Sequence, residues 1–225
     1  MAVIEGSTTG TLVDVGVADG QSAMFTTVKP IPWGLLGHYR VTQATGTLAA
    51  ALAASAQLFT FRWTDATRLC VVTNVKAVFQ TQALFTAGTA DFGFDLFKAT
   101  GISAGGGGTA IATPSKMRAT MANTLLAATD VRIATTGALT ALTVLDTNAI
   151  EQSVGRTQRT NPTAGTEEQF VNIPTLNYAP NVQGGEYPLV LSQNEGFVLR
   201  NRTIWPAAGT GNLIVTVNWA EVTNY

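Results

Sequence analysis

The C-terminal stretch from Pro188 to Val222, PLVLSQNEGFVLRNRTIWPAAGTGNLIVTVNWAEV, decides the fold class. It contains three short apolar runs, at 188–192, 196–201 and 212–222, separated by the turn-forming segments QNEG and PAAGTG. In the last run, apolar residues occupy every second position: Leu213, Val215, Val217 and Trp219. This period is typical of half-buried strands, so we predict that the stretch forms a meander of antiparallel strands.

The same patterning extends towards the N-terminus. Phe59, Phe61 and Trp63 alternate with polar residues, and a second apolar run follows at 71–79. We predict that these two runs pair as a hairpin through the turn at 64–67. A further strand is predicted at 90–97, where three apolar side chains share one side: Phe92, Phe94 and Leu96.

Helical signals are confined to one place. After Thr113-Pro114-Ser115, apolar residues recur every four positions at Met117, Met121 and Leu125, which predicts one short helix. The segment 151–169 is polar and rich in turn formers, so we expect it to be an exposed loop.

Residues 1–36 differ from the rest because they are rich in Gly and turn formers, and Pro30 and Pro32 favour extended backbone. We predict an extended N-terminal arm at 1–36, which packs either on its own domain or on a neighbouring chain. Residues 37–225 are then one domain. The predicted fold class is all-β, an antiparallel β-sandwich of jelly-roll type with at most one or two short helices.

The composition favours assembly with other chains. Charged residues make up 12% of the chain, whereas soluble domains usually carry about 25%. Surfaces of Thr, Ala and Gly lose water at a smaller free-energy cost than charged ones, so we expect a homo-oligomer. The net charge of −1 disfavours nucleic acid or anionic membranes as partners. No signal peptide or apolar membrane span is visible.

Candidate catalytic residues are few. His38, the single histidine, stands in an expected first strand, and Cys70, the single cysteine, stands in the apolar run at 69–72. We interpret both as structural residues. Asp91 and Asp95 share a strand face, but four extended residues separate them by about 13 Å, too far for a glycosidase pair. We therefore expect a solvated face there, and no enzymatic activity, metal, cofactor or small-molecule substrate.

Aromatic residues supply the candidate partner-binding sites. Trp63 and Trp219 are in phase with apolar neighbours, so we assign them to the core. Trp205 stands beside a turn, and we expect it to be exposed and to contact a partner. The arm offers a second candidate, Pro30-Ile31-Pro32-Trp33, with Ile31 and Trp33 as anchors.

The run at 188–222 resembles the last strands of jelly-roll proteins from tailed-phage virions, particularly the decoration or cement proteins of the capsid exterior. The resemblance implies a homotrimer that binds the major capsid protein lattice and stabilises it. It also implies assembly in the host cytoplasm and location on the outside of the virion. It carries no catalytic or ligand motif.

Three alternatives stay open at this point. A single-jelly-roll virus coat protein fits the size, although Lys29 is the one basic residue before Gly37 and coat proteins commonly have a basic arm. A receptor-binding or carbohydrate-binding β-sandwich domain would display aromatic side chains on loops. A polysaccharide depolymerase is the third, and the shortage of His and of close carboxylate pairs disfavours it.

Overall fold

The computed structural model describes residues 5–6, 11–12, 15–18, 21–24, 37–83, 85, 90–103, 106–140, 143–159, 168–172, 174–182, 185–223 and 225. The chain divides into two compact units, Met1–Trp33 and Gly34–Tyr225. In the first unit β1 (Glu5–Gly6) pairs with β2 (Thr11–Leu12), and β3 (Val15–Ala18) pairs with β4 (Gln21–Met24), both antiparallel. Residues 25–36 lie outside the described residues, so the predicted arm at 1–36 stays a prediction.

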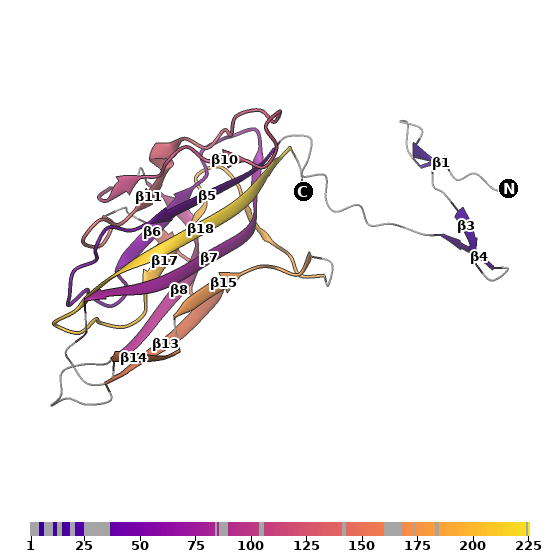
Figure 1. Cartoon of the computed structure of the whole chain (residues 1–225). Helices are drawn as coiled ribbons and strands as arrows, with labels where there is room; N and C mark the ends of the chain where they lie inside the picture. Colours follow the sequence, from indigo (N-terminus) through magenta and orange to yellow (C-terminus); the bar gives the residue numbers. More distant parts are fainter. Residues whose placement is uncertain are drawn as a thin grey trace. The chain divides into compact units, whose positions relative to one another are not determined.

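The second unit is a sandwich of two antiparallel sheets (Figure 1). The first sheet has the order β10-β5-β18-β7-β15, and β16 also pairs with β7. Its strands are β5 (His38–Ala44), β7 (Leu69–Ala83), β10 (Ser115–Lys116), β15 (Thr175–Tyr178), β16 (Leu189–Leu191) and β18 (Thr210–Val222).

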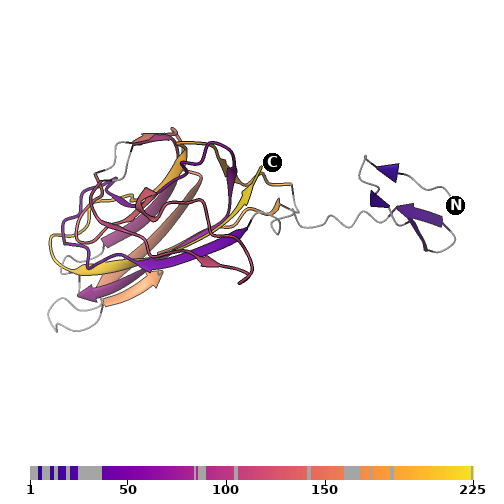
Figure 2. The ribbon, with the colours of Figure 1, turned by 90° about the horizontal axis from the view of Figure 1, so that it is seen from above.

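The second sheet has the order β14-β13-β8-β17-β6-β11-β9, and β12 also pairs with β8. Its strands are β6 (Gln57–Arg62), β8 (Ala90–Ile102), β9 (Thr109–Ala110), β11 (Val131–Ile133), β12 (Thr143–Leu145), β13 (Glu151–Arg159), β14 (Glu168–Asn172) and β17 (Gly196–Asn201). Figure 2, turned by 90°, shows the two layers of strands.

The long strands pair in a nested order that defines a jelly roll. The first strand, β5, pairs with the last, β18; β6 pairs with β17; β7 pairs with β15 and β16; and β8 pairs with β13. From β5 to β8 successive strands therefore alternate between the two sheets, and β13 begins the return path beside β8. This confirms the predicted fold class of a jelly-roll β-sandwich.

Aromatic side chains from both sheets meet in the core. Phe61 of β6 stacks on Phe197 of β17 with ring centroids 5.0 Å apart, and it meets Trp219 of the opposite sheet edge-on at 5.5 Å. Trp63 and Trp219 are fully buried, as predicted. At these positions the period-two pattern correctly predicted which side chains point into the core.

The predicted hairpin between 59–63 and 71–79 is wrong, because β6 and β7 belong to different sheets. The intervening segment crosses between the sheets. Its turn is closed by Asp65, whose Oδ1 accepts the backbone N–H groups of Thr67 and Arg68, both at 2.8 Å. The indole of Trp63 also donates to the Arg68 carbonyl at 2.8 Å. The predicted C-terminal meander is wrong for the same reason, since β17 lies in the other sheet from β16 and β18.

The predicted helix after 113–115 is also wrong. The described residues 116–127 contain no helix, and the helical element that follows them is a 3-10 turn, η1 (Ala128–Asp130). Strand β5 binds the backbone of the predicted helix instead: Met117 donates to the His38 carbonyl at 2.9 Å, and the Tyr39 hydroxyl donates to the Ala122 carbonyl at 3.1 Å. These tertiary hydrogen bonds outweigh the weak helical pattern.

The segment predicted as a loop at 151–169 is largely strand where it is described, because β13 and β14 form the edge of the second sheet. Ser153 and Gly155 are buried and alternate with exposed Gln152, Val154 and Arg156. These inward positions hold small residues, and at Gly155 the chain at Pro174 approaches too closely for a larger side chain. Small inward residues hide the apolar alternation that sequence reasoning relies on.

An insertion at 103–150, between β8 and β13, adds strands to one edge of each sheet. Its strands β9 and β11 extend the second sheet beyond β6, and its β10 extends the first sheet beyond β5. Leu145 of β12 packs on a small cluster of Ala99, Ile102 and Val198 on the outside of the second sheet. The insertion therefore covers two sheet edges that would otherwise invite pairing with other chains.

Candidate interaction surface

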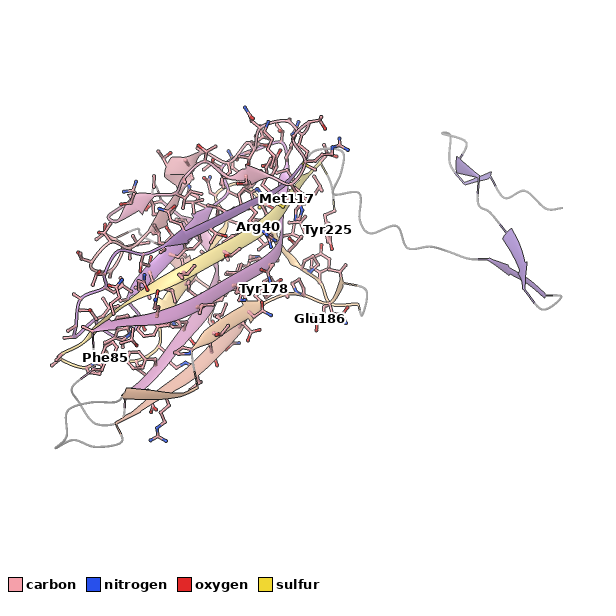
Figure 3. All side chains as sticks on the ribbon, in the orientation of Figure 1. Arg40, Phe85, Met117, Tyr178, Glu186 and Tyr225 are labelled. Atoms are coloured by element: carbon pink, nitrogen blue, oxygen red, sulfur yellow. The ribbon has the colours of Figure 1, made fainter. Side chains whose placement is uncertain are left out.

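The outward side of the first sheet is a continuous exposed or half-buried surface across β5, β18, β7 and β15, and we call it the outer face. In Figure 3 the labelled side chain of Arg40 lies on this sheet. The outer face consists of Arg40, Thr42, Ala44, Asn74, Lys76, Val78, Thr175, Asn177, Ile214, Thr216 and Asn218. These residues are predominantly hydroxyl, amide and small apolar side chains.

The strand register arranges this face in cross-strand rows. One row is apolar at its centre, where Ile214 stands opposite Ala44 on one side and Val78 on the other. The next row places Thr216 between Thr42 and Lys76. Facing side chains of such rows are near enough to interact, which makes each row a unit of the surface.

Many polar groups of the outer face bond to one another. The Arg40 Nε donates to Asn218 Oδ1 at 2.6 Å, and the hydroxyls of Thr42 and Thr216 lie 2.9 Å apart. On the other side, Asn74 Nδ2 donates to Asn177 Oδ1 at 3.3 Å. Groups that are already hydrogen-bonded lose less when a partner displaces water, so this surface is suited to burial in an interface.

Charge is sparse on the outer face. Arg40 and Lys76 are its charged residues, both are cationic, and no carboxylate stands among the residues that define it. A partner that covers this face removes few charged groups from water, so the desolvation free energy it must overcome is small. A partner with a carboxylate opposite Arg40 or Lys76 would match it best.

The prediction that Trp205 is exposed is wrong. Its side chain is 2% exposed and packs edge-on against Phe79, Phe92 and Phe85, with ring centroids 5.3, 5.7 and 6.0 Å away. Phe79 comes from the first sheet and Phe92 from the second, so Trp205 joins the two sheets. The segment after β17 folds back over the end of the sandwich and buries the indole, a path that the adjacent Pro206 and Gly209 do not reveal in sequence.

The other predicted partner-binding residues, Pro30, Ile31, Pro32 and Trp33, lie outside the described residues. Their role as anchors stays a prediction.

The residues weighed for chemistry are held in structural contacts. Cys70 is a buried free thiol, and burial raises the pKa of that thiol well above its usual value, which disfavours the reactive thiolate. The His38 ring lies 3.2 Å from the Thr73 hydroxyl, and its pKa is lowered by burial and by the nearby Arg40. Asp95 is buried, contrary to the solvated face expected there, because it accepts two hydrogen bonds from Arg202.

Within the described ranges, no group of three or more His, Cys, Asp or Glu side chains is arranged to hold a metal ion. None of the helical residues described forms a segment long and apolar enough to cross a membrane.

The fold and surface define a jelly-roll β-sandwich protein with one broad, weakly charged sheet face. Comparison with protein-family models, with curated proteins and with solved structures finds no match.

Proposed function

We propose that this chain is a non-enzymatic virion structural protein, namely a capsid decoration or cement protein. It forms a homo-oligomer, with a trimer as the expected state, and binds the outer surface of the major capsid lattice. The outer face of the first sheet is the observation that carries the proposal.

The physical support is the cost of dehydrating that face. It spans four strands, and its hydroxyl and amide groups already bond to one another. Covering the central row of Ile214, Ala44 and Val78 adds apolar burial at about 25 cal/mol per Å². A lattice repeats each contact many times, so weak individual contacts produce high occupancy.

The test changes the centre of the outer face. Ile214→Glu places a carboxylate in the apolar row, where a partner would have to bury it unpaired. Ile204→Glu makes the same change at a side chain that is 68% exposed and outside the outer face. The measurements are the mass of each protein in solution and its cosedimentation with capsids assembled from the cognate major capsid protein.

We expect the parent chain to be oligomeric and to cosediment with capsids. Ile214→Glu should lose oligomers, capsid binding or both while its denaturant midpoint stays close to that of the parent, and Ile204→Glu should keep both properties. A monomeric parent chain that does not sediment with capsids contradicts the proposal.

A further inference from the structure

A groove of about 480 Å³ lies where β13 begins and β15 ends, next to the loop that leads from β15 to β16. These strands belong to different sheets and contact each other, so the groove lies at an edge where the two sheets meet. Its principal lining residues are Glu151, Asn177, Tyr178, Glu186 and Tyr187. Figure 3 shows two of them, Tyr178 and Glu186, at the same end of the sandwich as Tyr225.

Tyr187 presents an unusually open aromatic ring. Its side chain is 74% exposed, the highest exposure among the large apolar side chains of the described residues. The ring is nevertheless oriented, because it meets Tyr225 edge-to-face with centroids 5.2 Å apart and planes at 86°. An aromatic ring held in place and left open to solvent is a platform for stacking.

The groove also holds polar groups whose positions are fixed. Glu186 Oε2 accepts the backbone N–H of Asn181 at 2.6 Å, which holds this carboxylate at the groove. Asn177 Oδ1 accepts from Asn74 at 3.3 Å, so in this orientation its amide retains two N–H donors. The groove is therefore lined by one carboxylate acceptor and one amide donor in addition to the aromatic platform.

From this combination we propose that the groove binds a neutral oligosaccharide. The C–H face of a pyranose ring packs on an aromatic ring, and its neighbouring hydroxyls bond to carboxylate and amide groups. The carboxylates Glu151 and Glu186 line the groove without any Lys or Arg among its lining residues. Like-charge repulsion therefore disfavours uronic and sialic acids, and this selects neutral sugars.

The test uses two sets of sugars and three variants. The full chain is screened against neutral oligomers of glucose and of N-acetylglucosamine, and against oligogalacturonate and sialylated oligosaccharides. The neutral oligomer that binds most tightly is then titrated calorimetrically into the parent chain and into Tyr187→Ala, Tyr187→Phe and Val144→Ala. Val144 is the matched control, because it is 65% exposed and does not line this groove.

We expect binding of a neutral oligomer and none of the acidic ones. Tyr187→Ala should lower the association constant by about tenfold or more, while Tyr187→Phe stays within about threefold of the parent. Val144→Ala should bind as the parent does. Absence of binding to every neutral oligomer at millimolar concentration overturns the proposal, as does preference for acidic sugars or an unchanged constant in Tyr187→Ala.

Discussion

Glu221 is the buried carboxylate on which a whole segment depends. It stands on β18, is 1% exposed, and accepts hydrogen bonds from the Thr124 hydroxyl, the Leu125 backbone N–H and the Trp219 indole. It thereby ties the insertion at Thr124 and Leu125 to the first sheet. Burial raises the pKa of this carboxyl above its ordinary value of 4.5, and the hydrogen bonds offset only part of that increase.

The raised pKa predicts a dependence of stability on pH. The folded state holds a proton on Glu221 in a range where the unfolded state has released it, so the free energy of unfolding falls as pH rises from 4.5 through the folded-state pKa. Glu221→Gln keeps an oxygen acceptor and carries no titrating proton. We expect this variant to lose that falling slope in urea unfolding series between about pH 4 and pH 8.

Asp146→Asn serves as the control, because it removes a carboxyl from an exposed position. Its slope should match that of the parent chain. A Glu221→Gln variant with the parent's full slope would show that other groups cause the pH dependence.

At the scale of elements, Gly155 of β13 marks a close approach between a strand and the chain that enters the next strand. A Cβ at this position would lie 2.2 Å from Pro174 Cγ, so any larger residue forces β13 away from the segment that enters β15. These two elements line the edge where the two sheets come together. The absence of a Cβ at Gly155 therefore allows the two sheets to pack at this edge.

We predict that Gly155→Ala lowers the free energy of unfolding by about 1–3 kcal/mol, because it overpacks a buried contact. Gly137→Ala is the matched control, since a Cβ there meets nothing within 4 Å. Guanidinium unfolding of both variants checks the prediction. Equal midpoints for the two variants would mean that the segment at Pro174 moves aside without cost.

For the whole molecule, the two compact units predict separable roles. The second unit contains both complete sheets and the described core, so removal of residues 1–36 should leave its unfolding midpoint unchanged. Under the proposed function, the removed segment includes the anchors Ile31 and Trp33. We expect the 37–225 chain to lose part or all of its capsid cosedimentation.

A point variant separates the anchors from the rest of the segment. Trp33→Ala in the full chain should weaken capsid binding in the same direction as the deletion. Unchanged cosedimentation of the 37–225 chain removes any role of the arm, whereas a lowered unfolding midpoint would show that the arm packs on its own domain.

The sequence predicted which side chains of a strand point into the core better than it predicted which strands pair. Phe61, Phe94 and Trp219 are buried, as their alternation predicted. The side of a strand that turns towards the core depends on the strand's own alternation of apolar and polar residues. The hairpin at 64–67 and the meander after 188 were wrong, because pairing depends on partners far away in the sequence. In a jelly roll those partners are nested, with β5 next to β18.

The two candidate surfaces likewise combine features that the sequence predicts with features that only the tertiary structure shows. The alternation in β18 predicts that Ile214, Thr216 and Asn218 share a side, but only the register places Thr42 and Lys76 beside Thr216. Tyr187 gives no signal in sequence beyond its position in a turn-rich segment. Only the fold brings Glu151 and Asn177 to the groove that Tyr187 and its neighbour Glu186 line.

The amino-acid sequence by itself determined an all-β chain, poor in charge, with a jelly roll as the favoured architecture, because period-two patterning and composition are local properties that each segment carries alone. The tertiary structure decided which strands neighbour each other, that Trp205 lies in the core, and which polar side chains share a face or a groove. Those features depend on contacts between residues distant in the chain, whose free energy exists only once both sheets are assembled.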